Sequence, residues 1–561
     1  MHRITSDSEA ILFRFSYSAS DVFIVKTIDC HKWSKTKKAW VFPLEESILK
    51  KILNKFPDSI VDECVYDDLA KDKIDFEKAI KLKQLLLNKV ITKFQNFLNL
   101  PFYNHQLKAF NLFSQLDIAI DFSQMGCGKT MVQIALLKYR ILYYDISKIL
   151  IIAPIYIAED VWVNEIPKFA FNDKFTFPIY LLTETGNLTS KEYVKEVLQN
   201  NDDGIYIINY AKLNKAIDYL KKIKWDFIIV DESSKIKNNQ AKRTSAIMKL
   251  SDARFKSILT GTPAPNHLIE LFPQVKFISK KIFGKSIVSF KELFFHKIPE
   301  TFELIPKEGT RDEFKRRLSP YMLAFKKKDC LDLPPLTIQN LYVVLSDEQK
   351  KAYKSLEKEM IAIIEDKRYT AQIKIVQIMR LAQITSGFLQ NTDGADFITF
   401  KDNPKMDYML DKIEQISYDD KTLIWCHFRQ NSIMIQERLS KLYGKNSSVI
   451  YNGLITKQEK SINKARFLND KNCRFFIANP KSAGMGLNLS VANYSFYYSA
   501  SHSFEDYDQS RERYNREGQF KNMTEFRLIS KKTIDELIFK CIERKRNTND
   551  FITDMKEFLN G

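Results

Sequence analysis

The order of apolar and polar positions divides the chain into four stretches. Over residues 13–18 aromatic side chains alternate with polar ones, which is the period-two pattern of a strand. We expect a second strand over residues 22–28 and a third over residues 39–42, with a basic turn between them. Helical spacing follows, so residues 1–96 are predicted to form a small α+β domain.

The rest of the chain alternates short apolar runs with amphipathic helical stretches, once over residues 97–330 and again from residue 423 to the C-terminus. This alternation is typical of α/β domains with parallel sheets. Residues 331–345 contain two consecutive prolines and are predicted to be a linker. A third domain, residues 346–561, is expected to begin with a helical insertion over residues 346–410. Strands are predicted at 118–122, 149–153, 205–209, 227–230, 423–426, 448–451, 475–478 and 494–498.

The charge of the chain favours a polyanionic partner. Its 561 residues include 87 Lys and Arg against 69 Asp and Glu, a formal net charge of +18. Nucleic acid is the commonest polyanion that such a balance serves. A generally lysine-rich proteome is the alternative explanation of the charge.

Other features of the composition exclude several classes of protein. The N-terminus is polar and no run reaches the roughly 18 apolar residues of a membrane helix, so we expect a cytoplasmic protein without a membrane partner. The seven cysteines are dispersed and form no CxxC pair. Zinc sites and a disulfide framework are therefore not expected.

The sequence from Ser123 to Thr130 reads SQMGCGKT and lies between a predicted strand and a predicted helix. Its two glycines let backbone N–H groups approach phosphates, its lysine supplies a positive charge, and its threonine can bind Mg²⁺. Ser123 replaces the first glycine of the common pattern. The predicted nucleotide-binding residues of this phosphate loop are Met125, Gly126, Cys127, Gly128, Lys129 and Thr130.

A buried-looking strand ends in Asp231 and Glu232, about a hundred residues later. Adjacent carboxylates at such a place suit Mg²⁺-dependent ATP hydrolysis, with Asp231 on the metal and Glu232 on the attacking water. Such pairs are also common on protein surfaces. The phosphate loop upstream favours the catalytic interpretation.

Two segments near the C-terminus complete the set. A glycine-bearing loop over residues 481–489 contains Gly486, and Arg513 and Arg516 lie three residues apart. We expect both arginines on one face of a helix, from which they can reach a γ-phosphate as arginine fingers. A solvated helix face is the alternative for an isolated pair of this kind. Six of the 15 glycines lie in these segments and in the Thr-Gly-Thr-Pro turn at residues 260–263, namely Gly126, Gly128, Gly261, Gly484, Gly486 and Gly518, which indicates backbone requirements there.

The order and spacing of these motifs over residues 97–545 resemble the Swi/Snf family of superfamily II helicases. The resemblance implies two tandem RecA-like lobes with helical protrusions, with ATP and Mg²⁺ bound between them. It implies that Gln106 reads adenine and that Gly486 lies at the nucleotide. Through similar motifs it also implies DNA contacts by Pro154, Lys237, Asn238, His427 and Lys481.

The family moves along duplex DNA without fully separating its strands, and this chain is expected to be a monomeric, DNA-dependent ATPase of that kind. A strand-separating helicase on DNA or RNA is the alternative. A scaffold without activity is disfavoured, because the lysine, the carboxylates and the arginines are all retained. Ser233-Ser234 stands where the family usually has a small residue and a histidine, and Asn479-Pro480 stands where it often has hydroxyl residues. These departures concern the coupling between motifs and one contact with the DNA backbone.

Aromatic and basic residues interleave in the N-terminal domain, at Trp33, Lys37 and Trp40. Such side chains can stack on bases and bind phosphates. The segment resembles the HARP domain of annealing helicases, which would imply recognition of forked DNA and a role in repair, recombination or replication. Ordinary strand packing beside a solvated lysine turn is the alternative. The abundance of Lys, Ile and Asn indicates an AT-rich bacterial or viral genome, and so a nucleoid-associated protein or one in the host cytoplasm.

Overall fold

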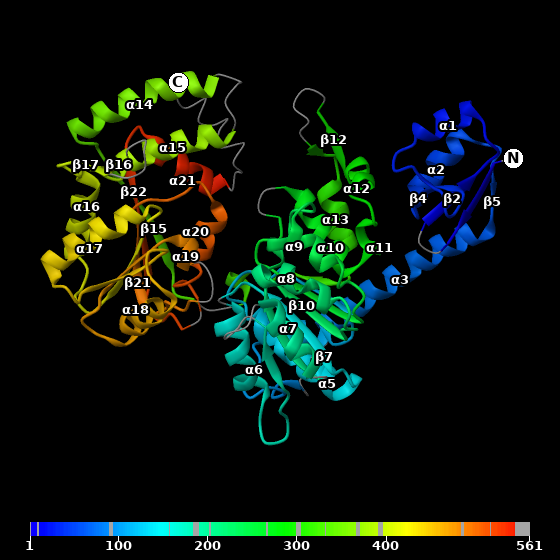
Figure 1. Cartoon of the computed structure of the whole chain (residues 1–561), viewed down its shortest axis with the longest axis horizontal. Helices are drawn as coiled ribbons and strands as arrows, with labels where there is room; N and C mark the ends of the chain where they lie inside the picture. Colours follow the sequence, from blue (N-terminus) through cyan, green and yellow to red (C-terminus); the bar gives the residue numbers. More distant parts are fainter. Residues whose placement is uncertain are drawn as a thin grey trace. The chain divides into compact units, whose positions relative to one another are not determined.

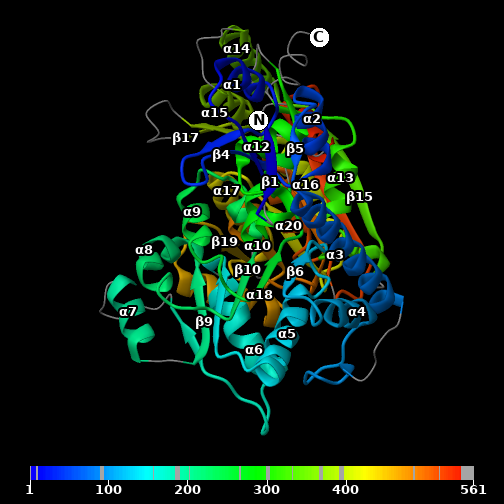
Figure 2. The ribbon, with the colours of Figure 1, turned by 90° about the vertical axis from the view of Figure 1, so that its right-hand side faces the viewer.

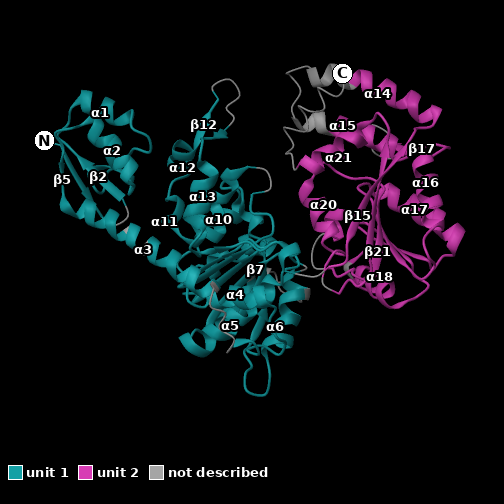
Figure 3. Cartoon of the chain, turned by 180° about the vertical axis from the view of Figure 1, so that it is seen from behind, with its two compact units in different colours: residues 1–330 teal, residues 331–561 magenta. Residues whose placement is uncertain are grey.

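The computed structural model describes residues 2–7, 10–88, 94–155, 157–182, 190–200, 203–264, 267–298, 304–330, 333–365, 371–390, 397–483, 487–516 and 518–544. The chain forms two compact units, residues 1–330 and residues 331–561 (Figure 1, Figure 3). The first unit contains the N-terminal domain and one α/β lobe, and the second contains another α/β lobe.

The N-terminal domain is a five-stranded mixed sheet in the order β3-β4-β2-β1-β5. Trp40, Phe13 and Ile52 lie in its core. Its elements are β1 (Arg3–Ser6), β2 (Ala10–Arg14), α1 (Ala19–Lys26), β3 (Lys32–Ser34), β4 (Ala39–Pro43), α2 (Glu46–Lys55), β5 (Ile60–Val61) and α3 (Glu63–Asn88).

The strand predicted over residues 22–28 is wrong, because helix α1 covers most of that segment. Ser18 caps the helix by accepting a hydrogen bond from the Asp21 N–H. Val25 is buried two positions after Phe23, whose side chain is exposed. The capping serine and the acidic first turn outweigh the strand preference of the apolar residues that follow.

Helix α3 leads from this domain to the α/β lobe (Figure 2). Three further contacts join the two parts of the first unit. The Cys30 N–H donates to Glu292 Oε2 at 2.6 Å, and Arg317 forms an ion pair with Glu45 at 3.1 Å. Lys83 donates to two backbone carbonyl oxygens of the lobe. The N-terminal domain is therefore held against the lobe by polar contacts as well as by the chain.

The lobe of the first unit is built on a seven-stranded parallel sheet, ordered β14-β6-β11-β10-β7-β9-β8. Its strands are β6 (Ile118–Asp121), β7 (Lys148–Ala153), β8 (Ile179–Leu181), β9 (Gly204–Asn209), β10 (Phe227–Asp231), β11 (Phe255–Leu259) and β14 (Met322–Leu323). Its helices are α4 (Asn104–Phe113), α5 (Lys129–Tyr144), α6 (Val163–Ala170), α7 (Ser190–Asn200), α8 (Tyr210–Leu220), α9 (Lys242–Met248), α10 (Leu271–Ile278), α11 (Lys280–Phe283), α12 (Ile287–Phe294) and α13 (Thr310–Leu318), with a hairpin of β12 (Phe295–Lys297) and β13 (Leu304–Pro306).

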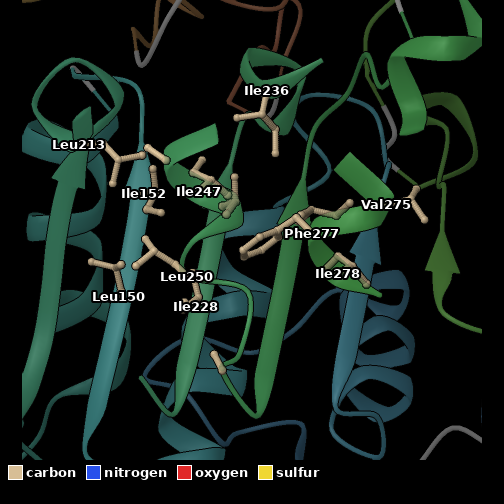
Figure 4. Packing of buried hydrophobic residues seen from close by; sticks show 14 of the residues in the cluster. Leu150, Ile152, Leu213, Ile228, Ile236, Ile247, Leu250, Val275, Phe277 and Ile278 are labelled. Carbon is tan, nitrogen blue, oxygen red and sulfur yellow. The ribbon is translucent and has the colours of Figure 1, made fainter. Parts of the chain in front are cut away.

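Both faces of this sheet are buried. Leu150 and Ile152 of β7 pack into one apolar cluster, together with Ile228 of β10 (Figure 4). Ile149 and Ile151 point to the opposite face and join a second cluster. Because parallel strands covered on both faces need apolar residues at every position, these strands are continuous apolar runs in the sequence.

The second unit contains a six-stranded parallel sheet in the order β15-β22-β21-β18-β20-β19. Its strands are β15 (Leu336–Val343), β18 (Lys421–Trp425), β19 (Ser448–Tyr451), β20 (Phe475–Ala478), β21 (Ala492–Tyr497) and β22 (Met523–Ser530). Its helices are α14 (Asp347–Glu365), α15 (Ala371–Thr385), α16 (Pro404–Glu414), α17 (Arg429–Tyr443), α18 (Lys457–Asn469), α19 (Pro480–Ala483), α20 (Phe504–Arg511) and α21 (Ile534–Arg544), with a hairpin of β16 (Phe388–Gln390) and β17 (Phe397–Thr399).

The prediction of an α/β protein with two RecA-like lobes is confirmed by these two parallel sheets. Residues predicted as a linker contain β15, which pairs along its whole length with β22 at the edge of the second sheet. Among the described residues, no helix combines the length and the apolar character needed to cross a membrane.

A buried ion pair fixes the helices of the second unit. Lys405 Nζ lies 2.5 Å from Asp535 Oδ2, with both side chains less than 10% exposed. Asp535 also accepts hydrogen bonds from Thr385 Oγ1 and from the Ser530 N–H. The carboxylate therefore joins α15, α16 and β22 to α21, and its charge depends on the lysine for compensation.

We expect Lys405→Met to lower the free energy of unfolding of this unit by about 3–5 kcal/mol, because it leaves a buried carboxylate without its cation. Hydrogen exchange of the α21 and β22 amides measures the loss. The matched control is Arg438→Met, which removes a half-exposed ion pair with Asp407 on the same helix α16 and should cost about 1 kcal/mol or less. Equal effects of the two substitutions would contradict the importance of the buried pair.

Candidate active site

Three neighbouring strands of the first sheet, β6, β11 and β10, end at the same edge. The phosphate loop follows β6, Thr260 follows β11, and Asp231 ends β10. Because the strands are parallel and adjacent, three motifs that are far apart in sequence meet at their carboxyl ends. This edge of the sheet is the candidate active site.

The phosphate loop is held by its own backbone. Gly126 and Gly128 have φ angles of 84° and 74°, in the left-handed region that favours glycine. Lys129 Nζ donates to the carbonyl oxygens of Ser123 at 2.7 Å and Gln124 at 3.1 Å. The ammonium group therefore lies within the curve of the loop, where a phosphate group would be surrounded by N–H donors.

The start of α4 lies directly against this loop. A Cβ atom added to Gly128 would lie 2.0 Å from Gln106 Nε2. The Gln106 side chain also accepts a hydrogen bond from the Tyr103 N–H, and His105 Nε2 lies 2.9 Å from the Cys127 carbonyl oxygen. Gly128 is thus required both for its backbone angle and for the close approach of Gln106.

The carboxylate of Asp231 is buried and carries two hydrogen bonds. The Trp162 indole N–H donates to Oδ2 at 2.9 Å, and the Glu232 N–H donates to Oδ1 at 2.8 Å. Burial, with a contribution from the charge of Glu232, raises the pKa of Asp231 to about 6. The charged form is therefore disfavoured unless a cation approaches.

Glu232 has a fixed orientation. Its Oε1 accepts hydrogen bonds from Ser234 Oγ at 2.8 Å and from Thr260 Oγ1 at 2.9 Å. Its φ angle of 52° is unusual for a residue with a side chain, and the Tyr210 hydroxyl donates to the Asp231 carbonyl oxygen beside it. The strained backbone turns this carboxylate toward the end of β11.

The two serines that depart from the family pattern both have partners. Ser233 Oγ donates to Gln274 Oε1, and the Gln274 amide in turn donates to the carbonyl oxygens of Pro263 and Glu270. Ser234 binds Glu232 directly. Contacts between the carboxylate motif and the segment after β11 therefore exist without a histidine.

These residues fit a magnesium nucleotide. Thr130 stands one residue after Lys129 at the start of α5, and the buried Asp231 lacks a full positive countercharge. Burial also raises the pKa of Asp121, which is buried at the end of β6 and interacts with Lys129. A loop of N–H donors, an amine, a hydroxyl group and buried carboxylates are the groups that a phosphate-bound Mg²⁺ requires.

Reasoning from sequence missed three residues that shape this site. Asp121 accepts a hydrogen bond from the Ser123 N–H at 3.0 Å, Trp162 holds Asp231, and Tyr210 holds the backbone after it. A carboxylate that ends an apolar strand was a usable signal for Asp121. The partners of Trp162 and Tyr210 depend on how the strands are ordered in space, which no local pattern reveals.

In the second unit, Arg513 and Arg516 do not share a helix face as expected, because α20 ends at Arg511 and the chain continues in turns. The physical reason is Tyr514, whose ring is fully buried and whose hydroxyl donates to Glu525 Oε2 at 2.8 Å. Arg513 is 5% exposed and its Nε donates to the Gln509 carbonyl oxygen. Arg516 donates to the Leu487 carbonyl oxygen at 3.4 Å.

The residues expected to contact DNA differ in their exposure. Pro154 is buried, whereas Asn238 and Lys481 are exposed. Lys237 lies 3.9 Å from Glu270, and burial lowers the pKa of His427 to about 4, so that this imidazole is neutral at physiological pH. The predicted DNA contacts therefore differ in how accessible their side chains are within each unit. Gly486 lies outside the described residues.

The aromatic and basic residues of the N-terminal domain also differ in their exposure and contacts. Trp33 is 48% exposed, while Trp40 is 8% exposed and belongs to the core of the domain. Their rings meet edge to face with centroids 5.5 Å apart. Lys37 forms an ion pair with Asp7. Trp33 is therefore about half exposed, whereas Trp40 is buried.

Comparison with known proteins agrees with this arrangement. The model of the SNF2-related domain matches residues 105–389, and that of the helicase conserved C-terminal domain matches residues 404–518. The chain belongs to the SNF2-related family. The predicted resemblance is confirmed, and the two matched domains with their ATP-dependent helicase relatives support a DNA-dependent ATPase. The resemblance of the N-terminal domain to HARP domains stays a prediction.

Curated relatives of this SNF2-related chain include helicases from two bacteria. It is 26% identical to "Uncharacterized ATP-dependent helicase MG018" of Mycoplasma genitalium, over 75% of the chain and 39% of that protein. It is 25% identical to "Putative ATP-dependent helicase/translocase YwqA" of Bacillus subtilis, over 78% of the chain and 46% of that protein. The chain spans less than half of the length of these relatives.

Among solved structures, the chain is similar to the Sulfolobus solfataricus SWI2/SNF2 ATPase core in complex with dsDNA, with 24% identity and a TM-score of 0.40. The match covers 82% of this chain and 94% of that one.

The raised pKa of Asp231 predicts how the stability of the fold depends on pH. The ionised carboxylate destabilises the folded state. This free-energy penalty is small near pH 4, grows as the pH rises to about 6, and is complete at pH 7.5. Asp231→Asn should therefore raise the free energy of unfolding by about 3 kcal/mol at pH 7.5 and by little at pH 4.

Thermal denaturation at the two pH values checks this. Asp173→Asn, at an exposed position of the same lobe, should change stability by less than about 0.5 kcal/mol. A destabilised Asp231→Asn at pH 7.5 would show that its two hydrogen bonds matter more than its buried charge.

Proposed function

We propose that this protein is an ATP-driven translocase that moves along double-stranded or forked DNA. The observation that carries the proposal is the meeting of the phosphate loop, Asp231 and Glu232 at one edge of the first sheet, in a chain of the SNF2-related family. The proposed role in the cell is the remodelling or reannealing of strands, or the displacement of bound proteins, in repair, recombination or replication.

In the proposed mechanism the loop amides and Lys129 bind the β- and γ-phosphates, and Gln106 recognises the adenine. Thr130 and Asp231 would hold Mg²⁺, which when bound neutralises charge on the phosphate oxygens. Glu232 would orient the attacking water through its Oε2, because Oε1 is already held by Ser234 and Thr260. A fixed carboxylate of this kind needs no reorganisation when the water reacts.

Arg513 and Arg516 are proposed to stabilise the negative charge of the transferred phosphoryl group. Their segment is supported by Glu525, a fully buried carboxylate of β22. It accepts hydrogen bonds from the hydroxyl groups of Tyr514 and Tyr507 and pairs with Arg527. Glu525 lies in strand β22 and binds Tyr514, which stands between the two arginines. The position of the arginine segment therefore depends on this strand and not on a continuous helix through Arg513 and Arg516.

DNA is the proposed partner, bound mainly through its phosphates. The net charge of +18 favours a polyanion, and the exposed Lys481 and Asn238 are available for backbone contacts. We propose that the motor acts as a monomer. We also propose that the N-terminal domain recognises the DNA structure on which the motor loads, with Trp33 as its stacking residue.

A strand-separating helicase is the second candidate, because the same ATPase machinery serves both activities. Displacement of a triplex-forming strand without separation of the underlying duplex distinguishes a translocase from that helicase.

ATP hydrolysis should be stimulated by duplex or forked DNA, and Lys129→Ala should lower the rate at least ~100-fold, because the β- and γ-phosphates lose their main positive charge. The measurement is phosphate release with no nucleic acid, single-stranded DNA, duplex, fork and RNA. Lys174→Ala, at an exposed turn of the same lobe, is the control and should keep the full rate. If neither duplex nor fork stimulates hydrolysis, the translocase proposal fails.

The proposed role of the N-terminal domain is tested at its exposed tryptophan. Trp33→Ala should weaken binding to forked DNA by about 1–3 kcal/mol, the usual worth of one base stacked on an aromatic ring, and should leave ATP hydrolysis on plain duplex unchanged. Fluorescence anisotropy with fork and duplex measures the difference. The control is Phe23→Ala, which removes another exposed aromatic ring of the domain. An unchanged preference for forks in Trp33→Ala would remove this residue from recognition.

A further inference from the structure

A buried glutamine connects two segments at the edge of the first sheet that forms the candidate active site. Gln274 lies in α10, and its side chain is fully buried among the apolar residues of that helix. Burying an amide is unfavourable unless its hydrogen-bonding groups have partners. A glutamine in the apolar face of a helix therefore breaks the pattern of its own element, which is common at functional positions.

The three hydrogen bonds of Gln274 fix the orientation of its amide. Its Nε2 donates to the carbonyl oxygens of Pro263 at 2.6 Å and Glu270 at 2.8 Å, and its Oε1 accepts a hydrogen bond from Ser233 Oγ at 2.8 Å. Because carbonyl oxygens only accept, the amide nitrogen must face them and the amide oxygen must face the serine. A rotated amide would leave both carbonyl oxygens without a donor.

The segment that this glutamine holds lies between the phosphate loop and the acidic motif. Thr260, at the start of the segment, donates to Glu232 Oε1 at 2.9 Å. A Cβ atom added to Gly261 would lie 3.0 Å from Met125 Cγ of the phosphate loop. Pro263 is the residue whose carbonyl oxygen the amide binds. The segment is therefore held at one end by the carboxylate and at the other by the glutamine.

The residues expected to contact DNA lie next to this link. The Lys237 N–H donates to the Ser234 carbonyl oxygen at 3.2 Å, and Lys237 Nζ lies 3.9 Å from Glu270 Oε1. The next residue, Asn238, is exposed. A DNA phosphate beside Lys237 would compete with the Glu270 carboxylate for the ammonium group. Glu270 stands immediately before α10, and its carbonyl oxygen is one of the two that Gln274 binds.

We propose that Gln274 is a positioning residue that couples DNA binding at residues 237–238 to the orientation of Glu232. The inference rests on the proposed function, in which DNA stimulates ATP hydrolysis. DNA contacts displace the start of α10, and the amide transmits this displacement to the segment after β11 and to the acidic motif. Coupling of this kind runs through a continuous set of hydrogen bonds between rigid elements.

The coupling acts on the carboxylate oxygen that is still available to water. Glu232 Oε1 accepts from Thr260 and Ser234, so a movement of either hydroxyl group turns the direction of Oε2. A misplacement of about 1 Å in a group that positions a reactant costs on the order of 100-fold in rate. Ser233-Ser234 stands where the family usually has a small residue and a histidine, so the amide of Gln274 supplies a connection suited to this chain.

Two substitutions and a matched control separate this link from simple packing. Gln274→Met keeps the length of the side chain and removes all three hydrogen bonds, whereas Ser233→Ala removes only the bond to the acidic motif. The control is Gln349→Met in the second unit. Gln349 is also fully buried, its Nε2 donates to the Ile384 carbonyl oxygen at 2.8 Å, and its Oε1 accepts from the Ser346 N–H at 3.1 Å.

The test measures ATP hydrolysis by the full chain at saturating ATP, with and without saturating duplex DNA. The ratio of the two rates should fall at least ~5-fold in Gln274→Met and in Ser233→Ala, the lower end of the usual coupling between two sites. The double variant should fall no further than Gln274→Met, because both changes break one link. Gln349→Met should lower the melting temperature about as much as Gln274→Met and should keep the ratio of the unaltered protein. Fluorescence anisotropy establishes the DNA concentration that saturates each variant.

Three results would overturn the proposal: an unchanged ratio in Gln274→Met, an equal fall in Gln349→Met, or losses that multiply in the double variant. If the unaltered protein hydrolyses ATP but is not stimulated by duplex, the proposed function fails and the coupling fails with it. If the unaltered protein and Gln274→Met are stimulated alike, only the role of Gln274 fails. Should Gln274→Met not fold, Ser233→Ala decides alone, because it leaves both bonds from the amide to the backbone in place.

Discussion

The structure of the first unit depends on keeping two carboxylates at the end of a buried parallel strand. Asp231 is fixed by an indole and a backbone N–H, and Glu232 by two hydroxyl groups. A buried carboxylate without a cation is costly, so the neighbouring groups must hold it with hydrogen bonds until a cation arrives. The Tyr210 hydroxyl and the left-handed backbone of Glu232 follow from the same requirement.

The parallel order of the strands explains why these carboxylates can meet the phosphate loop. Strand β11 lies between β6 and β10, so Thr260 at its end stands between the loop and the acidic pair. The hydrogen bond from Thr260 to Glu232 is a direct link between the segment after β11 and the carboxylate. Ser234 donates a second hydrogen bond to Glu232, and Ser233 binds Gln274 in the segment after β11. The carboxylate motif therefore stays connected to this segment with hydroxyl groups at the positions where the family usually has a small residue and a histidine.

Much of this could be predicted from sequence because it depends on local patterns. Continuous apolar runs identify buried parallel strands, and glycines beside Lys129 identify a loop that approaches phosphates. The failures have physical causes. At residues 22–28 the cap at Ser18 outweighed strand propensity, and after Arg511 the burial of Tyr514 on Glu525 ended a helix whose arginine spacing was helical. A local capping contact decided the first case, and a tertiary contact decided the second.

Two side chains of the phosphate loop contact residues 325–330 of the same unit. The side chains of Ser123 and Cys127 contact the backbone of Phe325, so each already has a partner within the first unit. A position of this kind can vary while Lys129 and Asp231 stay fixed. Because Cys127 lies between Gly126 and Gly128, whose φ angles are 84° and 74°, the contact of its side chain with Phe325 also helps to fix the backbone of the phosphate loop.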